Sequence, residues 1–426
     1  MCISVLLLLL LVCSAQASHF YGTVMTFNLK NTNSDGSVRV VLRYKLSFRS
    51  CTDRDTWDCF SGNCGSETLV LNIVDQESSS EWCQREGIMT RQVPTNAPFQ
   101  MQLSGGNWIS SIQNGIVNWR ALTVVDLRNR SDTGQANRSP QTTVLPALRV
   151  PSNCRRNVNL LAFDPDGDEV KCRYGSTSDE CNPCTLPSAL SLSESCTLSF
   201  SNTSSPQGPY AVQLMMEDFP RQTITLRQTN GNETARTTNE ALSKIPVQFV
   251  FRVDPVVPSC TEGHYLPKLL PPTPAHGARL YTPVNQTLEI IISAEAANAT
   301  VSELLFSGPH NTLVINVTGL FILHWTPSAE EDGETHPICF VVQAVLGSSK
   351  YHSELRCVTV TVGDEPPTAP TPSPGPSHTV GLTASLSSAT PLSEDDIRNA
   401  VVQQLREELI RRGVPADFIL RLVKVE

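Results

Sequence analysis

Three aspartates at alternate positions form the stretch of this sequence with the clearest chemical potential. Asp164, Asp166 and Asp168 are separated by Pro165 and Gly167. Proline presets φ for a turn and glycine supplies a permissive backbone, so the stretch predicts a tight corner. The three carboxylates would offer several oxygens to Ca²⁺, a hard cation that takes about six to eight oxygen ligands.

Two further acidic residues, Glu217 and Asp218, end a later segment that predicts a strand and would complete such a site. The competing interpretation is a solvated turn whose aspartates accept hydrogen bonds from backbone amides. Side chains at alternate positions share a face only where the chain is extended, so the bend expected at Pro165 and Gly167 favours the turn. Ca²⁺ is therefore a candidate cofactor and not an assigned one.

Catalytic motifs are not found in the sequence. It contains no Gly-x-Ser-x-Gly, no His-Glu-x-x-His and no glycine-rich phosphate loop, and none of its eight histidines lies four residues from another. His19 would help to ligate copper only as the first residue of the mature chain, and the expected cleavage leaves Ser18 first. We therefore predict that the protein is not an enzyme.

The corner must be held by strands on both sides. Residues 158–163 lead into it with apolar side chains, and residues 170–174 leave it with an alternating pattern. Residues 38–48, 210–218 and 245–253 are also typical of strands. With 30 prolines and little helical periodicity before residue 390, the sequence predicts an all-β fold of tandem antiparallel β-sandwich (Ig-like or cadherin-like) domains with a short C-terminal α-helix.

The 426 residues divide into six expected segments. These are a signal peptide (1–17), an N-terminal disulfide-containing β domain (18–145), a β-sandwich with the acidic corner (146–260), a second Ig-like β-sandwich (261–363), a Pro/Ser/Thr-rich linker (364–392) and an amphipathic helix (393–426).

The N-terminal segment indicates an extracellular address. A leucine run, residues 6–11, is followed by Ala15-Gln16-Ala17, a pattern typical of a secretory signal that is removed. No later stretch approaches about 18 consecutive apolar residues, so we expect no transmembrane segment in the mature chain. The net charge of −9 includes no basic cluster, which argues against nucleic acid as a partner.

Twelve cysteines remain after the expected signal, and an even number in a secreted chain predicts disulfides. Cys51, Cys59, Cys64 and Cys83 can pair among themselves in three ways. The others are Cys154, Cys172, Cys181, Cys184, Cys196, Cys260, Cys339 and Cys357.

Parity within the predicted domains suggests some of the pairs. Cys339 and Cys357 lie on consecutive expected strands and can pair. Cys260 then returns most simply to the domain before it, with Cys154 as a candidate. Cys181 and Cys184 have the spacing of a redox or zinc pair, but their irregular loop in an oxidising compartment favours a structural disulfide.

Seven Asn-x-Ser/Thr sequons agree with secretion and predict a glycoprotein. They are Asn129, Asn137, Asn202, Asn232, Asn285, Asn298 and Asn316.

The expected β-sandwich over residues 146–260 carries several motifs in a characteristic order. Asp-Pro-Asp-Gly-Asp is followed by Leu-Pro-x-x-Leu at Leu186, by Gly-x-Tyr-x-Val at Gly208 and by a closing alternating strand. This order resembles the cadherin-like and immunoglobulin-like domains of dystroglycan type, which implies a β-sandwich and no particular function. Residues 319–327 resemble another strand of that family, but the third domain lacks the acidic corner.

The start of the mature chain carries a second resemblance. Ser18-His19-Phe20-Tyr21-Gly22-Thr23 resembles the first strand of a group of secreted animal proteins that begin Ser-His-Phe-x-Gly-Gly-Thr. This chain departs from that pattern with a single glycine.

The C-terminal segment predicts an association helix. Its apolar face includes Ile397, Val401, Leu405 and Leu409 at helical spacing. An isolated helix of this length is marginal in water, so the face needs a partner. Docking on the chain's own β domains, self-association, and a heterologous partner or membrane surface all satisfy this need.

These observations predict a secreted, non-catalytic glycoprotein that acts as an extracellular binding, adhesion or matrix component. The alternative is a soluble recognition protein, lectin-like or of host defence, multimerised through the C-terminal helix. The sequence contains no basic patch and no short integrin-type tripeptide, so it does not identify the extracellular protein or glycan that the chain would bind.

Overall fold

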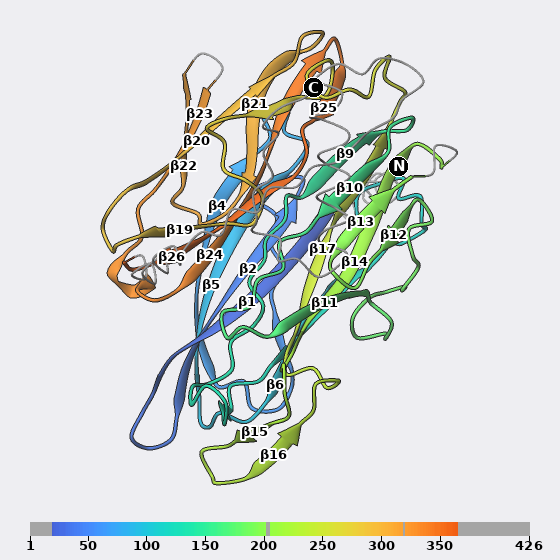
Figure 1. Cartoon of the computed structure of the whole chain (residues 1–426). Helices are drawn as coiled ribbons and strands as arrows, with labels where there is room; N and C mark the ends of the chain where they lie inside the picture. Colours follow the sequence, from blue (N-terminus) through green and yellow to red (C-terminus); the bar gives the residue numbers. More distant parts are fainter. Residues whose placement is uncertain (1–18, 202–204, 318–319, 365–426) are drawn as a thin grey trace, which may run out of the picture. The chain divides into compact units, whose positions relative to one another are not determined.

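The computed structural model describes residues 19–201, 205–317 and 320–364 (Figure 1). These residues belong to a unit that extends to Pro366, and a second unit begins at Pro367. The predicted signal peptide, the sequon at Asn202, the linker from residue 365 onward and the predicted helix 393–426 lie outside the described residues.

The largest sheet has eleven strands. Eight follow one another in the order β3 (Asp58–Ser61), β6 (Phe99–Gly105), β7 (Trp119–Val125), β17 (Lys244–Asp254), β1 (Phe20–Thr32), β2 (Val38–Phe48), β5 (Cys83–Val93) and β4 (Ser66–Gln76). Three more attach beside β17, namely β9 (Ala147–Pro151), β14 (Gly208–Phe219) and, through β14, β11 (Glu169–Tyr174).

The described residues also form four smaller sheets. One three-stranded sheet has the order β10 (Arg156–Asn159), β13 (Thr197–Phe200) and β12 (Leu190–Leu192). The other has the order β16 (Glu233–Arg236), β15 (Ile224–Arg227) and β8 (Asn129–Arg130). A four-stranded sheet has the order β18 (Lys268–Leu270), β20 (Leu288–Glu295), β23 (Leu320–Trp325) and β22 (Leu313–Val317). A five-stranded sheet contains β19 (Ala278–Thr282), β26 (Arg356–Val362), β24 (Thr335–Leu346), β21 (Thr300–Ser307) and β25 (Ser349–His352).

The predicted all-β class is confirmed. Within the described ranges the single helical element is a 3₁₀ turn, Ala329–Glu331. The strand predicted over residues 38–48 has the bounds of β2, whose alternating aliphatic and aromatic side chains are almost all buried. None of the described helices is long and apolar enough to cross a membrane.

Strand β17 links the first two predicted domains. It pairs along most of its length with β14 and, on its other side, with β9, β1 and β7. One hydrophobic core correspondingly draws buried side chains from both ranges, 18–145 and 146–260. The predicted boundary between these ranges is thus crossed by a continuous sheet, and the individual domain limits stay predictions.

Gly22 allows β1 to approach β17 closely. Its φ is +131°, and a Cβ atom at this position would lie 2.0 Å from the backbone oxygen of Gln248. Every other residue type carries a Cβ, so only glycine fits this crossing without moving the strands apart.

Residues 261–363 contain the four- and five-stranded sheets, which pack on each other as a β-sandwich. Its core contains Trp325, Phe306, Phe321 and Phe340, all nearly inaccessible to solvent. Val74 of β4 also packs into this core, so the third module contacts the eleven-stranded sheet directly.

The described chain contains six disulfides, which confirms the prediction of disulfide bonding. They are Cys51–Cys83, Cys59–Cys64, Cys154–Cys260, Cys172–Cys196, Cys181–Cys184 and Cys339–Cys357. Cys339 and Cys357 lie directly opposite each other on β24 and β26. Cys154–Cys260 ties together the two ends of the second predicted domain, across 106 residues.

Candidate functional site

The acidic corner, residues 164–168, forms a hydrogen-bonded turn. The Gly167 amide donates to the Asp164 carbonyl oxygen at 3.2 Å, and Gly167 has φ +84°. Oδ1 of Asp164 accepts the amides of Asp166 and Asp168 at 2.8 and 3.2 Å. The Asp164 side chain therefore organises the turn from inside it.

Strand pairing brings Asp218 to the corner. β11 begins directly after the turn and runs antiparallel to β14, with Val170 opposite Asp218. Asp164, Asp168 and Asp218 consequently each offer a carboxylate oxygen within 4.8 Å of the others, and all three residues are buried. These are the three residues of the predicted set that the structure brings together.

Asp166 and Glu217 do not join this group. Asp166 accepts hydrogen bonds from the amide and Nε of Arg138 at 2.8 and 2.9 Å. Glu217 accepts Nη2 of Arg173 at 2.8 Å and forms an ion pair with Lys244 at 3.0 Å. Glu217 precedes Asp218 on β14, and successive side chains of a strand point to opposite faces. A role for Asp166 and Glu217 in a calcium shell stays a prediction.

A buried guanidinium group occupies one side of the cluster. Arg130 Nη2 donates to Asp168 Oδ1 at 2.7 Å and to Asp132 Oδ2 at 2.8 Å, and Nη1 donates to Asn137 Oδ1 at 2.9 Å. Its side chain is 1% exposed. The sequence reasoning missed Arg130, since no local pattern relates it to a corner 38 residues away.

The positive charges do not balance the carboxylates. Two guanidinium groups, Arg130 and Arg138, face five carboxylates, namely Asp132, Asp164, Asp166, Asp168 and Asp218. Oδ2 of Asp164 is buried without a hydrogen-bond partner. A further positive charge, a proton or a cation, would therefore stabilise the cluster.

Protonation is the response that burial itself favours. Burial, and then the charges of Asp168 and Asp166, raise the pKa of Asp164. Burial and the charge of Asp164 raise the pKa of Asp218 well above its usual range. Hydrogen bonds from the amide and hydroxyl of Ser243, both at 2.7 Å, act against this rise at Asp218.

The donor set of the cluster fits a hard cation. Asp164, Asp168 and Asp218 supply carboxylate oxygens, and the unpartnered Asp164 oxygen has no competing donor. Oxygen ligands with no nitrogen or sulfur suit Ca²⁺ better than zinc or copper. Arg130 would remain beside the ion and reduce its affinity, because like charges repel.

Asn137 belongs to this site and is misplaced among the predicted glycosylation sites. Its side chain is fully buried, and Nδ2 donates to Asp218 Oδ2 at 3.2 Å. A glycan on Nδ2 has no room in the folded chain. The sequons at Asn129, Asn232, Asn285, Asn298 and Asn316 are exposed and stay predictions.

A second acidic cluster lies where the third module meets the eleven-stranded sheet. Glu331, Glu334 and His336 are buried within reach of one ion, but Arg43 already donates to Glu334 at 3.0 Å. Burial opposes ionisation of Glu334, yet its hydrogen bond with His336 and the charge of Arg43 hold its pKa well below its usual range.

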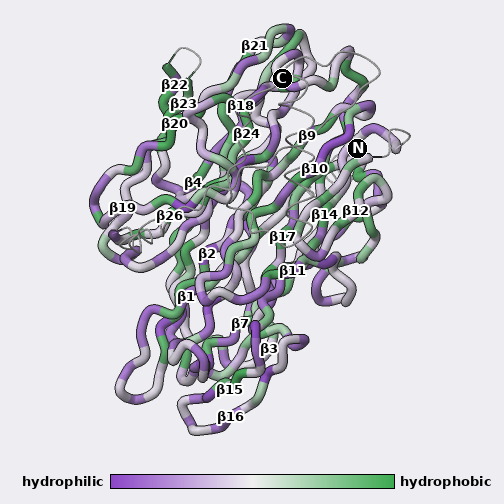
Figure 2. The backbone as a smooth tube through the Cα atoms, in the orientation of Figure 1, coloured by the Kyte–Doolittle hydropathy of each residue, from purple (hydrophilic) through white to green (hydrophobic). Residues whose placement is uncertain are grey.

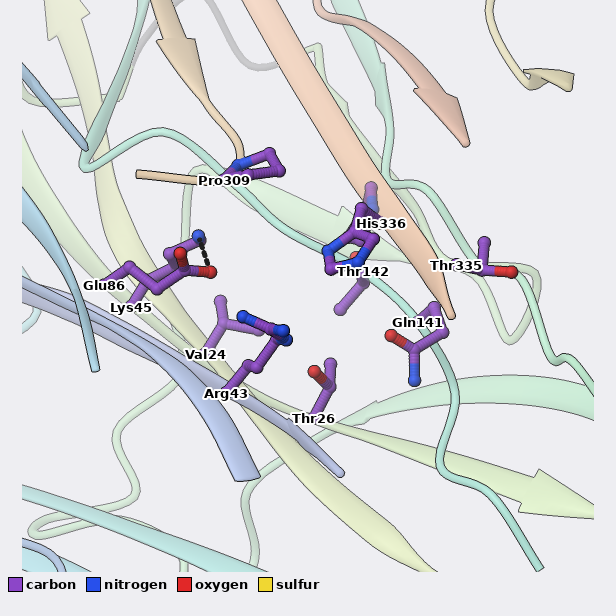
Figure 3. A pocket seen from close by; sticks show the side chains of 11 residues that line it. Val24, Thr26, Arg43, Lys45, Glu86, Gln141, Thr142, Pro309, Thr335 and His336 are labelled. Carbon is purple, nitrogen blue, oxygen red and sulfur yellow. Dashed lines mark hydrogen bonds and ion pairs between the residues drawn. The ribbon is translucent and has the colours of Figure 1, made fainter. Parts of the chain in front are cut away.

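The cavity beside this second cluster is small. Figure 3 shows Arg43, Lys45 and Glu86 facing Pro309 and His336 across it. Its volume is about 20 Å³, which admits about one water molecule. His310 Nδ1 lies 2.9 Å from Glu86, which is also bonded to Lys45. We interpret this region as a packing interface between the module and the sheet.

Comparisons with known proteins give a distant relative and several weak structural likenesses. No protein-family profile matches the chain. Integrin beta-like protein C of Dictyostelium discoideum is 22% identical over 332 residues, covering 71% of this chain. The chain spans 16% of the length of that relative.

Solved structures that resemble the chain do so only weakly. The N-terminal eight Ig domains of Down Syndrome Cell Adhesion Molecule are 11% identical with a TM-score of 0.15, covering 79% of this chain and 37% of that one. An endo-fucoidan hydrolase of glycoside hydrolase family 107 is 19% identical with a TM-score of 0.18, covering 52% of this chain and 34% of that one.

The hydrolase likeness corrects one prediction from the sequence. Several endo-fucoidan hydrolases of this family are among the similar structures, which contradicts the exclusion of enzymatic activity, and that exclusion is withdrawn. The motif search behind it could only detect catalytic groups with a known local spacing, whereas catalytic groups are assembled by tertiary structure. TM-scores of this size assign no activity to the chain.

Proposed function

We propose that this protein is a secreted glycoprotein that acts as an adhesion or matrix component outside the cell. The observation that carries the proposal is the set of six disulfides within one β-rich unit. Such a density of disulfides is typical of proteins that fold in an oxidising compartment and work outside the cell. The similarity to an integrin beta-like protein, which is 22% identical in a match that covers 71% of this chain, supports the adhesion role.

The proposal is tested by attachment. Beads coated with the purified, glycosylated chain are expected to retain cultured cells, whereas beads coated with albumin are not. Equal retention on both surfaces would contradict adhesion. Binding to a glycan array without cell retention would instead favour a soluble recognition protein.

We further propose that the acidic corner binds Ca²⁺ and stiffens the second module. The uncompensated charge of Asp164, Asp168 and Asp218 and the unpartnered Asp164 oxygen support this assignment. An ion bound to the folded state alone raises the free energy of unfolding by about 2.7 kcal/mol at a hundred times its Kd. Such rigidity would suit a module that transmits force between surfaces.

Thermal unfolding in millimolar Ca²⁺ and in EDTA measures this effect. The wild-type chain is expected to melt at a higher temperature in Ca²⁺, and Asp164→Asn is expected to abolish the difference. Asp58→Asn, on the exposed strand β3, is the matched control and should keep the full Ca²⁺ response. If the wild-type melts in Ca²⁺ and in EDTA superimpose, the calcium site is contradicted. Protonation of the carboxylates would then be the remaining interpretation of the cluster.

A further inference from the structure

The edge strand β22 is unusual because aliphatic side chains are exposed on both of its faces. Leu313, Val314, Ile315 and Val317 are 66, 40, 40 and 49% exposed. β22 ends the four-stranded sheet, so one side of its backbone has no neighbouring strand among the described residues. Figure 2 shows hydrophobic colour continuing across β20, β22 and β23.

Cross-strand register extends this apolar surface over three strands. Ile315 lies opposite Ile322 of β23, which lies opposite Ile291 of β20, so the three isoleucines form a row across the outer face of the sheet. Val317 and Leu320 form the start of a parallel row. The outer face of an antiparallel sandwich is usually polar, so this face is suited to contact with another surface.

The edge also lacks the features that normally prevent strands from pairing between molecules. Edge strands are protected by charges, prolines or β-bulges. β4, the exposed edge of the large sheet, carries Glu67 and has a register shift between Ile73 and Asp75. β22 pairs with β23 without a shift, and no Asp, Glu, Lys or Arg occurs between Glu303 and Glu330.

We propose that two copies of this chain pair edge to edge through β22, and that a glycan on Asn316 controls the pairing. An antiparallel, two-fold arrangement centred on Ile315 places Ile315 opposite its own copy and Leu313 opposite Val317 of the second copy. Every outer-face pair is then aliphatic and no charge meets a like charge, so the strand is complementary to itself. The two four-stranded sheets become continuous.

Asn316 provides the control because of its place in the same strand. It is exposed and begins the sequon Asn316-Val317-Thr318, and its side chain points to the face opposite Ile315. In the two-fold arrangement it lies beside Val314 of the second copy. A glycan at this position would fill the space that the second strand needs, so the glycosylated chain stays unpaired and the unglycosylated chain pairs.

The test measures molar mass by light scattering during size exclusion of the full chain made in glycosylating cells. Asn316→Gln is expected to double the protein mass relative to the fully glycosylated chain. Adding Ile315→Lys to this variant should return the mass to that of one copy, since two lysines then meet at the two-fold axis. Ile315→Glu should do the same, and mixing the Lys and Glu variants should restore the doubled mass.

Two further variants keep the result specific. Leu346→Lys also places lysine at a half-exposed leucine of the third module, but away from β22, and should leave the Asn316→Gln mass doubled. Leu405→Lys disrupts the predicted association helix and should also leave it doubled. An Asn316→Gln chain that stays at the mass of one copy, or a doubled mass that survives Ile315→Lys, would overturn the proposal. Cell retention on coated beads is scored separately and does not depend on these masses.

Discussion

Removal of the Arg130 guanidinium is expected to destabilise the protein more than any other single change at the acidic corner. Arg130→Met keeps the apolar stem and deletes the charge that bonds Asp168, Asp132 and Asn137. The side chain is 1% exposed, so water cannot replace the lost donors. Breaking a buried ion pair by removal of one partner costs about 3–5 kcal/mol.

The assay is urea unfolding followed by tryptophan fluorescence, with and without Ca²⁺. Arg227→Met is the matched control. Arg227 pairs with Glu233 on the neighbouring β15–β16 hairpin, but its side chain is 67% exposed. An exposed ion pair contributes about 0–1 kcal/mol, so the control should unfold close to the wild-type midpoint.

Calcium adds a second expectation for the same variant. A bound cation would replace part of the charge lost with Arg130, so Ca²⁺ should stabilise Arg130→Met more than it stabilises the wild type. If Arg130→Met and the Arg227→Met control have the same urea midpoint, the Arg130 guanidinium does not stabilise the corner, and the electrostatic reasoning is refuted. If it is destabilised but insensitive to Ca²⁺, the corner is a structural ion network without a metal.

Two other predictions concern pH and glycosylation. Burial, with smaller contributions from Glu303 and Glu77, raises the pKa of Asp75 to about 7. The folded chain therefore keeps a proton that the unfolded chain loses, and the free energy of unfolding should fall as pH rises from about 4 to about 7. Asp75→Asn should flatten this decline in urea titrations across that range, and an unchanged pH profile would show that Asp75 does not cause it. Intact mass spectrometry should show no glycan lost in Asn137→Gln but one lost in Asn298→Gln, and a lost glycan at Asn137 would contradict its burial in the folded chain.

Local patterns in the sequence are sufficient for the class of fold and for the turn at the corner. Alternation over residues 38–48 predicts β2 because a strand with buried side chains needs apolar residues at period two. Pro165 and Gly167 likewise predict the bend, since each restricts or frees φ at its own position. The even number of cysteines predicts disulfides without reference to any contact.

Long-range pairing decides what the corner and the edge can do. Asp218 reaches Asp164 only through the β11–β14 register. Arg130 of β8 and Asn137 of the segment after it also reach the corner, and no local pattern connects them to the turn. The sequence presents Asn137 as one sequon among seven, and burial alone separates it from the exposed ones. The apolar run of β22 predicts a strand whether that strand lies inside a sheet or at its edge. Packing of the whole module places β22 at the end of the sheet, and this position leaves the apolar run exposed.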